Sequence, residues 1–426
     1  GLIMEKRREK ILFDFVTGTI LIIILAAIFF TDGWNCAKYQ VIGYDEGYNA
    51  TVAANLAQTG EYKVSYPENI VFYNRISTGA PVIVPAALLY HFFGINAVTT
   101  NLIPLLYGTL SIFLLYFLLA IVLKKGPAPH LLAAAVTAGT VLTDLYFEYV
   151  SVHLIGEGAA IFYLLLCLLG IGLFYEKRKR LFLILAGAGL AAAFLTKTSM
   201  IFFFFFVFGI LLIETLFAKT VSGKSVGIFF AGFAAGFALV DAIKLFQLGS
   251  LPAYLKWWAA EWTNMLSQSS GVDLTYSIRD KINYLPQVFG INPYLSLAVI
   301  ALPVCLYGVH VICRGFLKKD FFLNNELSVV YGGVAGSSLL VYFILLGGSG
   351  LVYARRLAAN AFFVRLAVGA LAILLAEKAG KRFLKGLSSG FRTVVCMAVG
   401  WTAAGILIFH PSQLRGGMVN YLSKLT

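Results

Sequence analysis

NAVTTNLIPLLYGTLSIFLLYFLLAIVLKK, residues 96–125, is a long uncharged apolar run that ends in two lysines. About 20 consecutive apolar residues let a helix cross the hydrocarbon core of a bilayer, because each residue adds about 1.5 Å. A helix also satisfies its backbone hydrogen bonds internally, which a segment inside lipid must do. The run therefore predicts a transmembrane helix with its lysines at one membrane surface.

Similar runs recur along the whole chain. Of the 426 residues, 60% are hydrophobic and 12% are charged, whereas a soluble domain carries about 25% charged residues. We therefore predict an all-α polytopic membrane protein, one integral domain over residues 1–426 with about eleven transmembrane helices. The expected spans lie near residues 11–31, 96–123, 128–146, 157–175, 181–197, 200–218, 226–247, 286–313, 326–346, 358–376 and 391–410.

Basic residues in the short connections predict the orientation, since lysine and arginine are enriched in cytoplasmic loops. This places the N-terminus in the cytoplasm and the C-terminus outside, in a bacterial or archaeal plasma membrane. The same placement explains the net charge of +13 without nucleic acid as a partner. The basic clusters that carry this prediction lie at residues 6–10, 124–125, 176–180, 219–224, 314–319 and 378–392.

Two longer connections, residues 32–95 and 248–285, are then extracytoplasmic, and loops of this length are often functional. The first contains GYDEGYNATVAANLAQTGEY (43–62), whose apolar residues recur at helical spacing up to a C-capping Gly60. It also contains a segment at 79–94 that is too short to span and suits an interfacial, juxtamembrane helix. The second begins with Trp257 and Trp258, which favour the headgroup level.

Charged residues gather on the predicted outer face, where charge near hydrocarbon is costly and marks a functional site by default. They are Asp45, Glu46, Arg75, Asp144, Glu148, His153, Glu157, Lys197, Asp241, Lys244, Arg355, Arg356 and Arg365.

Several of these charges also have structural explanations. Asp45 could be a helix N-cap. Glu157 could interact favourably with the dipole of its own helix, or it could pair with His153 at i, i+4. Lys197 could extend to the headgroups. The Arg355–Arg356 pair could anchor a helix end, although a bound anion fits better on the outer side.

The order of these features resembles the GT-C superfamily of glycosyltransferases, near the protein O-mannosyltransferase and aminoarabinose transferase branch. A first span leads to an acidic pair in YDEGYNATVAANLAQTGEY, and STGAPVIVPAALLYHFFGIN follows. A second acid opens the fourth span in HLIGEGAAIFYLLLCLLG, and a Thr-Lys follows the fifth in LAAAFLTKTSMIFF. A Tyr/Arg element, VYARRLAANAFF, comes late in the chain.

The resemblance implies roles for individual residues. Asp45 corresponds to the catalytic acid of the first loop, Glu46 to its neighbour and Glu157 to the acid of the second outer loop. The residues that correspond to donor phosphate contacts are Arg75, Lys197, Tyr353, Arg355 and Arg356, with Tyr44, Tyr48 and His153 as supporting candidates.

Three positions depart from the family pattern. Tyr48 stands where relatives often have a basic residue, the segment after Arg75 lacks a double proline, and Glu157 replaces a common Asp. These departures bear on the sugar and the acceptor.

We therefore expect transfer of a sugar from a polyprenyl-phosphate donor, such as undecaprenyl phosphate, to an extracytoplasmic lipid, glycan or protein. The transfer would invert the anomeric carbon, with Asp45 as general base. A divalent metal, Mg²⁺ or Mn²⁺, at the outer carboxylates is an open alternative, although no recognised ligand spacing is present. Two other functions are a transporter or lipid flippase, and a non-catalytic membrane subunit that binds a partner through residues 248–285.

Overall fold

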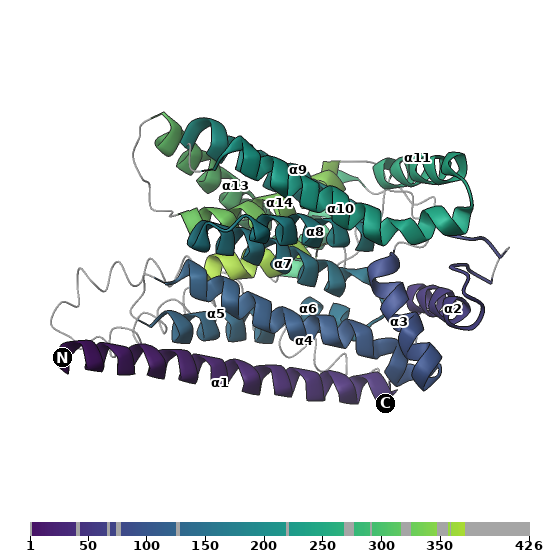
Figure 1. Cartoon of the computed structure of the whole chain (residues 1–426), viewed down its shortest axis with the longest axis horizontal. Helices are drawn as coiled ribbons and strands as arrows, with labels where there is room; N and C mark the ends of the chain where they lie inside the picture. The colour runs from purple at the N-terminus through teal and green to yellow at the C-terminus, as the bar shows by residue number, and fades with distance from the viewer. Residues whose placement is uncertain are drawn as a thin grey trace.

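The computed structural model describes residues 2–39, 43–65, 69–73, 78–124, 128–218, 221–267, 277–289, 292–316, 325–346, 357 and 359–370. These residues form helices and their connections, with one isolated antiparallel bridge between Lys63 and Val71 (Figure 1). The expected all-α fold is thus confirmed. The helices are α1 Leu2–Tyr39, α2 Tyr44–Thr59, α3 Ala80–Phe93, α4 Ala97–Val122, α5 Pro129–Thr143, α6 Leu145–Val152, α7 Gly156–Lys177, α8 Leu181–Thr196, a 3₁₀ turn Thr198–Met200, α9 Ile201–Ile213, a π-helical turn Glu214–Ala218, α10 Gly223–Leu248, α11 Leu251–Ser267, α12 Ile278–Phe289, α13 Pro293–Gly315, α14 Asn325–Leu346 and a last helix Ala359–Ala370.

The long helices lie side by side and run along one common direction, as Figure 1 shows. The short helix α3 stands across them, and α2, α3 and α11 gather at the same end of the bundle. We call this the α2/α3 end. The chain begins at the opposite end, which we call the N-terminal end.

Six described helices are long and apolar enough to cross a membrane, or seven if the bent pair α5 and α6, which meet at 76°, counts as one span. Four shorter apolar helices, Ala80–Phe93, Leu181–Thr196, Ser328–Phe343 and Ala359–Ala370, accompany them. On α1, Ile11, Leu12 and Phe13 are exposed, which suits contact with lipid. The protein is an integral membrane protein.

Two predicted spans differ from the helices, and a third is untested. The expected span 128–146 is broken, because α5 ends at Thr143 and α6 begins at Leu145. The expected span 286–313 begins later, because Pro286 belongs to α12 and Asn292 caps the new helix α13 by accepting from Tyr294 N at 2.9 Å. The expected span 391–410 lies outside the described residues, so the predicted count of eleven stays a prediction.

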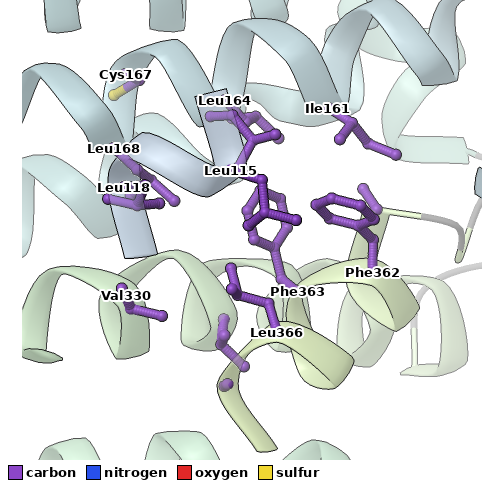
Figure 2. Close-up of a cluster of buried hydrophobic side chains, with 14 of the residues drawn as sticks. Leu115, Leu118, Ile161, Leu164, Cys167, Leu168, Val330, Phe362, Phe363 and Leu366 are labelled. Carbon is purple, nitrogen blue, oxygen red and sulfur yellow. The ribbon is translucent and has the colours of Figure 1, made fainter. Parts of the chain in front are cut away.

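The core joins the first half of the chain to its last described helix. Leu115 and Leu118 of α4 and Ile161 and Leu164 of α7 face Val330 of α14 and Phe362, Phe363 and Leu366 of the last described helix (Figure 2). Close packing also ties α8 to α10, since a Cβ on Gly187 would lie 2.2 Å from the Phe229 carbonyl oxygen. Small residues permit such backbone approach in membrane helices.

Buried charges at the N-terminal end connect neighbouring helices. Asp14 of α1 accepts hydrogen bonds from the backbone N–H groups of His130 and Leu131, both at 3.0 Å, and so caps the start of α5. Glu214 pairs with Arg314 of α13 at 3.3 Å.

A second buried ion pair lies at the break between α5 and α6. Asp144 contacts Arg365 at 2.8 Å and also accepts from Phe147 N at 3.0 Å, which caps α6.

Candidate active site

The acidic pair lies in the first turn of α2, and both carboxylate oxygens of Glu46 accept hydrogen bonds from backbone N–H groups. Its Oε2 accepts from Gly43 N at 2.7 Å and its Oε1 accepts from Leu154 N at 3.1 Å. The side chain is buried. Glu46 therefore closes the first turn of α2 and also ties it to the connection between α6 and α7.

Asp45 lies beside Glu46 in the first turn of α2 and is half-buried. The alternative that Asp45 is the N-cap is wrong, because Gly43 occupies that position. The positive end of the helix dipole favours a carboxylate here. Neighbouring Asn49 is buried and donates to Thr78 Oγ1 at 3.1 Å and to the Leu154 carbonyl at 2.7 Å, which fixes α2 against the start of α3.

Glu157 in the first turn of α7 and Lys197 after α8 form an ion pair at 3.1 Å, with side chains only 7% and 12% exposed. Lys197 therefore does not extend to the headgroups, and that alternative is wrong. His153 and Glu157 do not share a helix, because α6 ends at Val152 and α7 begins at Gly156. Both residues were expected on the outer face from the sequence, but the ion pair between them was not predicted.

Gly79 brings the start of α3 against the end of α8. Its N–H donates to the Thr196 carbonyl at 3.1 Å. A Cβ at Gly79 would lie 1.7 Å from the Leu195 carbonyl oxygen, so only glycine permits this approach. Segments far apart in the chain therefore meet next to Lys197.

A second charged cluster lies nearby, between α10 and α11. Asp241 accepts from Lys244 at 2.7 Å, Tyr254 at 2.6 Å and Trp258 at 2.9 Å. The Lys244 ammonium also lies 3.6 Å from the ring centroid of Trp257 and 4.1 Å from that of Trp258, a cation–π arrangement. Trp257 and Trp258 thus pack inside the protein and not only at the headgroup level.

Asp241 and Lys244 line a cavity of about 40 Å³, together with Thr196 and Thr198, the chain neighbours of Lys197. Thr198 donates to Glu261 at 2.8 Å beside it. Burial raises the pKa of Glu261, and the Thr198 hydrogen bond and the charges of Lys244 and Lys197 oppose that rise. Sequence reasoning missed Glu261 and Thr198, although Thr198 adjoins the Thr-Lys position. The cavity is lined by Val52, Tyr62, Lys63, Phe72, Tyr73, Thr78, Gly79, Ala80, Leu195, Thr196, Thr198, Asp241, Lys244, Trp257, Trp258 and Glu261.

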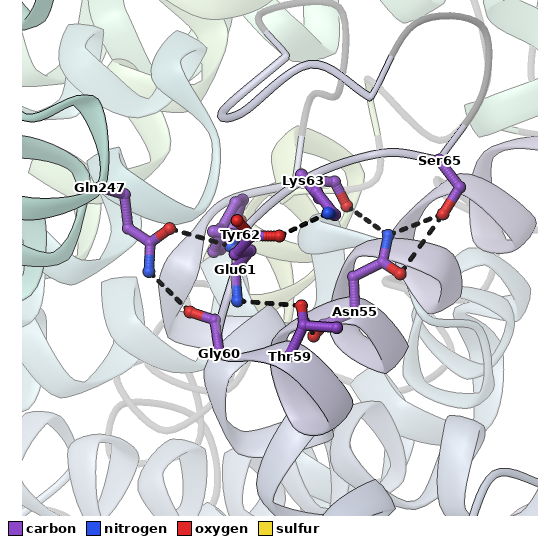
Figure 3. A network of polar contacts seen from close by, with 8 residues as sticks. All are labelled: Asn55, Thr59, Gly60, Glu61, Tyr62, Lys63, Ser65 and Gln247. Atoms are coloured by element: carbon purple, nitrogen blue, oxygen red, sulfur yellow. Dashed lines mark hydrogen bonds and ion pairs between the residues drawn. The ribbon is translucent and has the colours of Figure 1, made fainter.

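The loop after α2 is fastened to α10 by the network in Figure 3. Gln247 donates to the Gly60 carbonyl at 2.7 Å and accepts from Tyr62 N at 3.2 Å. On the other side of the loop, Asn55 donates to the Lys63 carbonyl at 2.9 Å. These contacts hold Tyr62 in the cavity wall.

The supporting candidates lie near the same segments. His153 is buried, and its Nδ1–H donates to the Tyr149 carbonyl at 2.7 Å. Burial lowers the pKa of His153, and the Glu46 charge and the hydrogen bond to the Tyr149 carbonyl only partly oppose this fall. Tyr48 is half-buried against the apolar contact of α2 with α3. The Tyr44 side chain lies outside the description, as do Arg75, Tyr353, Arg355 and Arg356.

No group of three or more His, Cys, Asp or Glu side chains that could hold a metal ion occurs among the described residues. Four carboxylates at this end, those of Glu46, Glu157, Asp241 and Glu261, contact backbone N–H groups, hydroxyls and lysines. The predicted divalent metal stays a prediction.

Comparison with solved structures identifies the fold. The chain is similar to ArnT from Cupriavidus metallidurans bound to undecaprenyl phosphate, with 12% identity, a TM-score of 0.52, and coverage of 92% of this chain and 76% of that one. It shares the GT-C fold. It is also similar to the Archaeoglobus fulgidus oligosaccharyltransferase tethered with an acceptor peptide, with 13% identity, a TM-score of 0.51 and coverage of 93% of this chain.

The expected GT-C resemblance is thus confirmed at the level of the fold. The chain spans 55% of the length of the oligosaccharyltransferase. No family model matches the sequence, and no curated protein matches it.

Proposed function

We propose that the protein is a membrane glycosyltransferase that moves a sugar from a polyprenyl-phosphate donor to an acceptor on the extracytoplasmic side. The convergence at the α2/α3 end supports this most. Asp45 lies in the first turn of α2 at this end. The buried Glu157–Lys197 pair lies next to a cavity that is lined by charged, hydroxyl and aromatic side chains. The GT-C fold, which ArnT shares in a structure that holds undecaprenyl phosphate, supports the same class of donor.

In this reaction Asp45 takes the proton of an acceptor hydroxyl, whose oxygen attacks the anomeric carbon. The bond from that carbon to the phosphate oxygen breaks, and polyprenyl phosphate leaves with the electron pair. Direct displacement inverts the configuration. General base catalysis of this kind contributes about 10²–10⁴-fold.

The remaining residues either position the reacting groups or stabilise the negative charge of the leaving phosphate. Glu46, which accepts from a backbone N–H group with each of its two oxygens, positions Asp45. Glu157 orients Lys197, and Lys197 supplies positive charge to the leaving phosphate. Arg75, Tyr353, Arg355 and Arg356 would complete the phosphate pocket, since arginine binds phosphate bidentately.

The membrane setting suits such a donor. A polyprenyl tail can lie among the apolar helices while its phosphate lies at the α2/α3 end. We assign this end to the extracytoplasmic side of a bacterial or archaeal plasma membrane, because the described basic residues of the predicted cytoplasmic clusters lie at the opposite helix ends, at positions 6–10, 124, 177–180, 224 and 314. The acceptor, a lipid, glycan or protein of the cell envelope, would reach Asp45 from outside.

The test is reconstitution of purified protein in liposomes with undecaprenyl-phosphate-linked sugars and a membrane extract as acceptor. We expect release of undecaprenyl phosphate together with a sugar-bearing product. Movement of the intact lipid-linked sugar across the bilayer without product would contradict the proposal and favour a flippase.

A further inference from the structure

The cavity at the α2/α3 end is small, and its volume limits the kind of group that it can hold. A water molecule needs at least about 10–15 Å³ of such space. The cavity of about 40 Å³ therefore holds about three oxygen-sized groups. This is room for the hydroxyl edge of a sugar, and too little for a lipid chain.

Its walls combine a carboxylate with aromatic rings. Glu261 and Thr198 supply hydrogen-bonding oxygens to the lining. Phe72, Trp257 and Trp258 also line it, and the Lys244 ammonium lies over the rings of all three. A ligand that fits must donate hydrogen bonds to a carboxylate, and the hydroxyl groups of a sugar do so.

The charge balance disfavours a phosphate in this cavity. Asp241 and Glu261 line it, and the two lysines whose charges act on Glu261, Lys244 and Lys197, already pair with Asp241 and Glu157. The other lysine in the wall, Lys63, pairs with Glu61. A phosphate in the cavity would therefore lie against two carboxylates.

The cavity nevertheless adjoins the proposed phosphate contact. Thr196 and Thr198 line it, and Lys197 lies between them. A donor whose phosphate contacts Lys197 would direct its next group, the sugar, toward Glu261. This step rests on the proposed function.

We propose that the cavity is the sugar-recognition subsite of the donor. Glu261 and Thr198 accept hydrogen bonds from the hydroxyl groups at one edge of the sugar. The Asp241–Lys244 pair holds the indoles of Trp257 and Trp258 in the cavity wall, because its contacts join α10 to α11.

The test compares lipid binding by native mass spectrometry for wild type, Glu261→Gln and Thr198→Val. The probes are undecaprenyl phosphate and its phosphodiesters with glucose, mannose or arabinose. Wild type should bind at least one sugar-bearing probe more tightly than the bare lipid. Since a hydrogen bond to a charged group contributes about 1.5–3 kcal/mol, Glu261→Gln should lower that preference about tenfold or more.

Retention of undecaprenyl phosphate by both variants serves as the control for correct folding. With an active donor, the variants should raise KM more than they lower kcat, and Glu261→Asp should restore part of the preference. If wild type prefers no sugar-bearing probe, or if the variants keep its preference, the subsite is wrong while the phosphate site stands. If wild type binds no lipid phosphate, the proposed function fails and the subsite fails with it.

Discussion

The two ends of the helix bundle both bury charged side chains, and at the α2/α3 end several of them line one cavity. At the N-terminal end, Glu214 pairs with Arg314, and Asp14 caps the start of α5. Each of these contacts joins neighbouring helices. Such pairs are weak evidence for a function, because a buried ion pair often contributes little net stability and can have a purely structural role.

At the α2/α3 end, the Glu157–Lys197 pair lies next to the Thr198–Glu261 hydrogen bond, and the same cavity meets Lys244. Segments distant in the chain supply these groups. The difference teaches that burial of charge alone does not locate a site in this protein. Convergence of several polar groups on a space that can admit a ligand does.

The largest expected effect is on catalysis at α2. Asp45→Asn removes the proposed general base and should lower kcat by about 10²–10⁴-fold. Binding of undecaprenyl phosphate should persist. Asp32→Asn, at an exposed acid of α1, is the matched control and should keep its activity. Sugar transfer in proteoliposomes measures both, and full transfer by Asp45→Asn would rule out its role.

The next effect is on folding at the Glu157–Lys197 pair. Lys197→Met leaves Glu157 buried without its cation, which should lower the free energy of unfolding by about 3–5 kcal/mol. The double variant Lys197→Met/Glu157→Leu should recover most of this stability but not the sugar transfer. Thermal unfolding in detergent and the transfer assay measure the two properties. Recovery of transfer by the double variant would show that the pair has a structural role only.

A smaller effect is expected at Glu46. Glu46→Gln replaces one acceptor oxygen with an amide that cannot accept from both Gly43 N and Leu154 N. A buried N–H left without an acceptor costs about 1–3 kcal/mol. We expect reduced stability and a moderate fall in kcat from misplacement of Asp45. A loss of activity as large as that of Asp45→Asn, in a variant of wild-type stability, would make Glu46 a catalytic residue.

The smallest effect concerns pH. Because burial raises the pKa of Glu261, the folded state holds its proton more tightly than the unfolded chain. The contribution of Glu261 to stability therefore falls as pH rises from the ordinary glutamate range through the raised pKa. Glu261→Gln should flatten the dependence of unfolding temperature on pH in that window. An identical profile for wild type and variant would contradict this environment for Glu261.

The fold was largely predictable because hydrophobic length is a strong signal in a membrane protein. The sequence indicated α1, α4 and α7 directly. It also indicated that α2 ends at Gly60, which is the C-cap in the structure. The start of α13 was misplaced because residues 286–313 form a nearly continuous apolar run. The cap at Asn292 marks the start of α13.

The site was predictable in part. Asp45, Glu157 and Lys197 were expected from the order of motifs. The contact of Glu46 with Leu154 was not predicted, because contacts between distant segments leave no periodic signal. Glu261 was missed for the same reason, since its partner Thr198 is 63 residues away.

The most direct test compares lipid binding at the two ends of the bundle. Native mass spectrometry with undecaprenyl phosphate would be run on wild type, Lys197→Met/Glu157→Leu and Arg314→Met/Glu214→Leu. Each double variant replaces one buried ion pair with apolar side chains. We predict that the first weakens retention of the lipid phosphate and that the second retains it as wild type does. Equal retention by all three proteins, or loss only in the Arg314 variant, would contradict a phosphate site at the α2/α3 end.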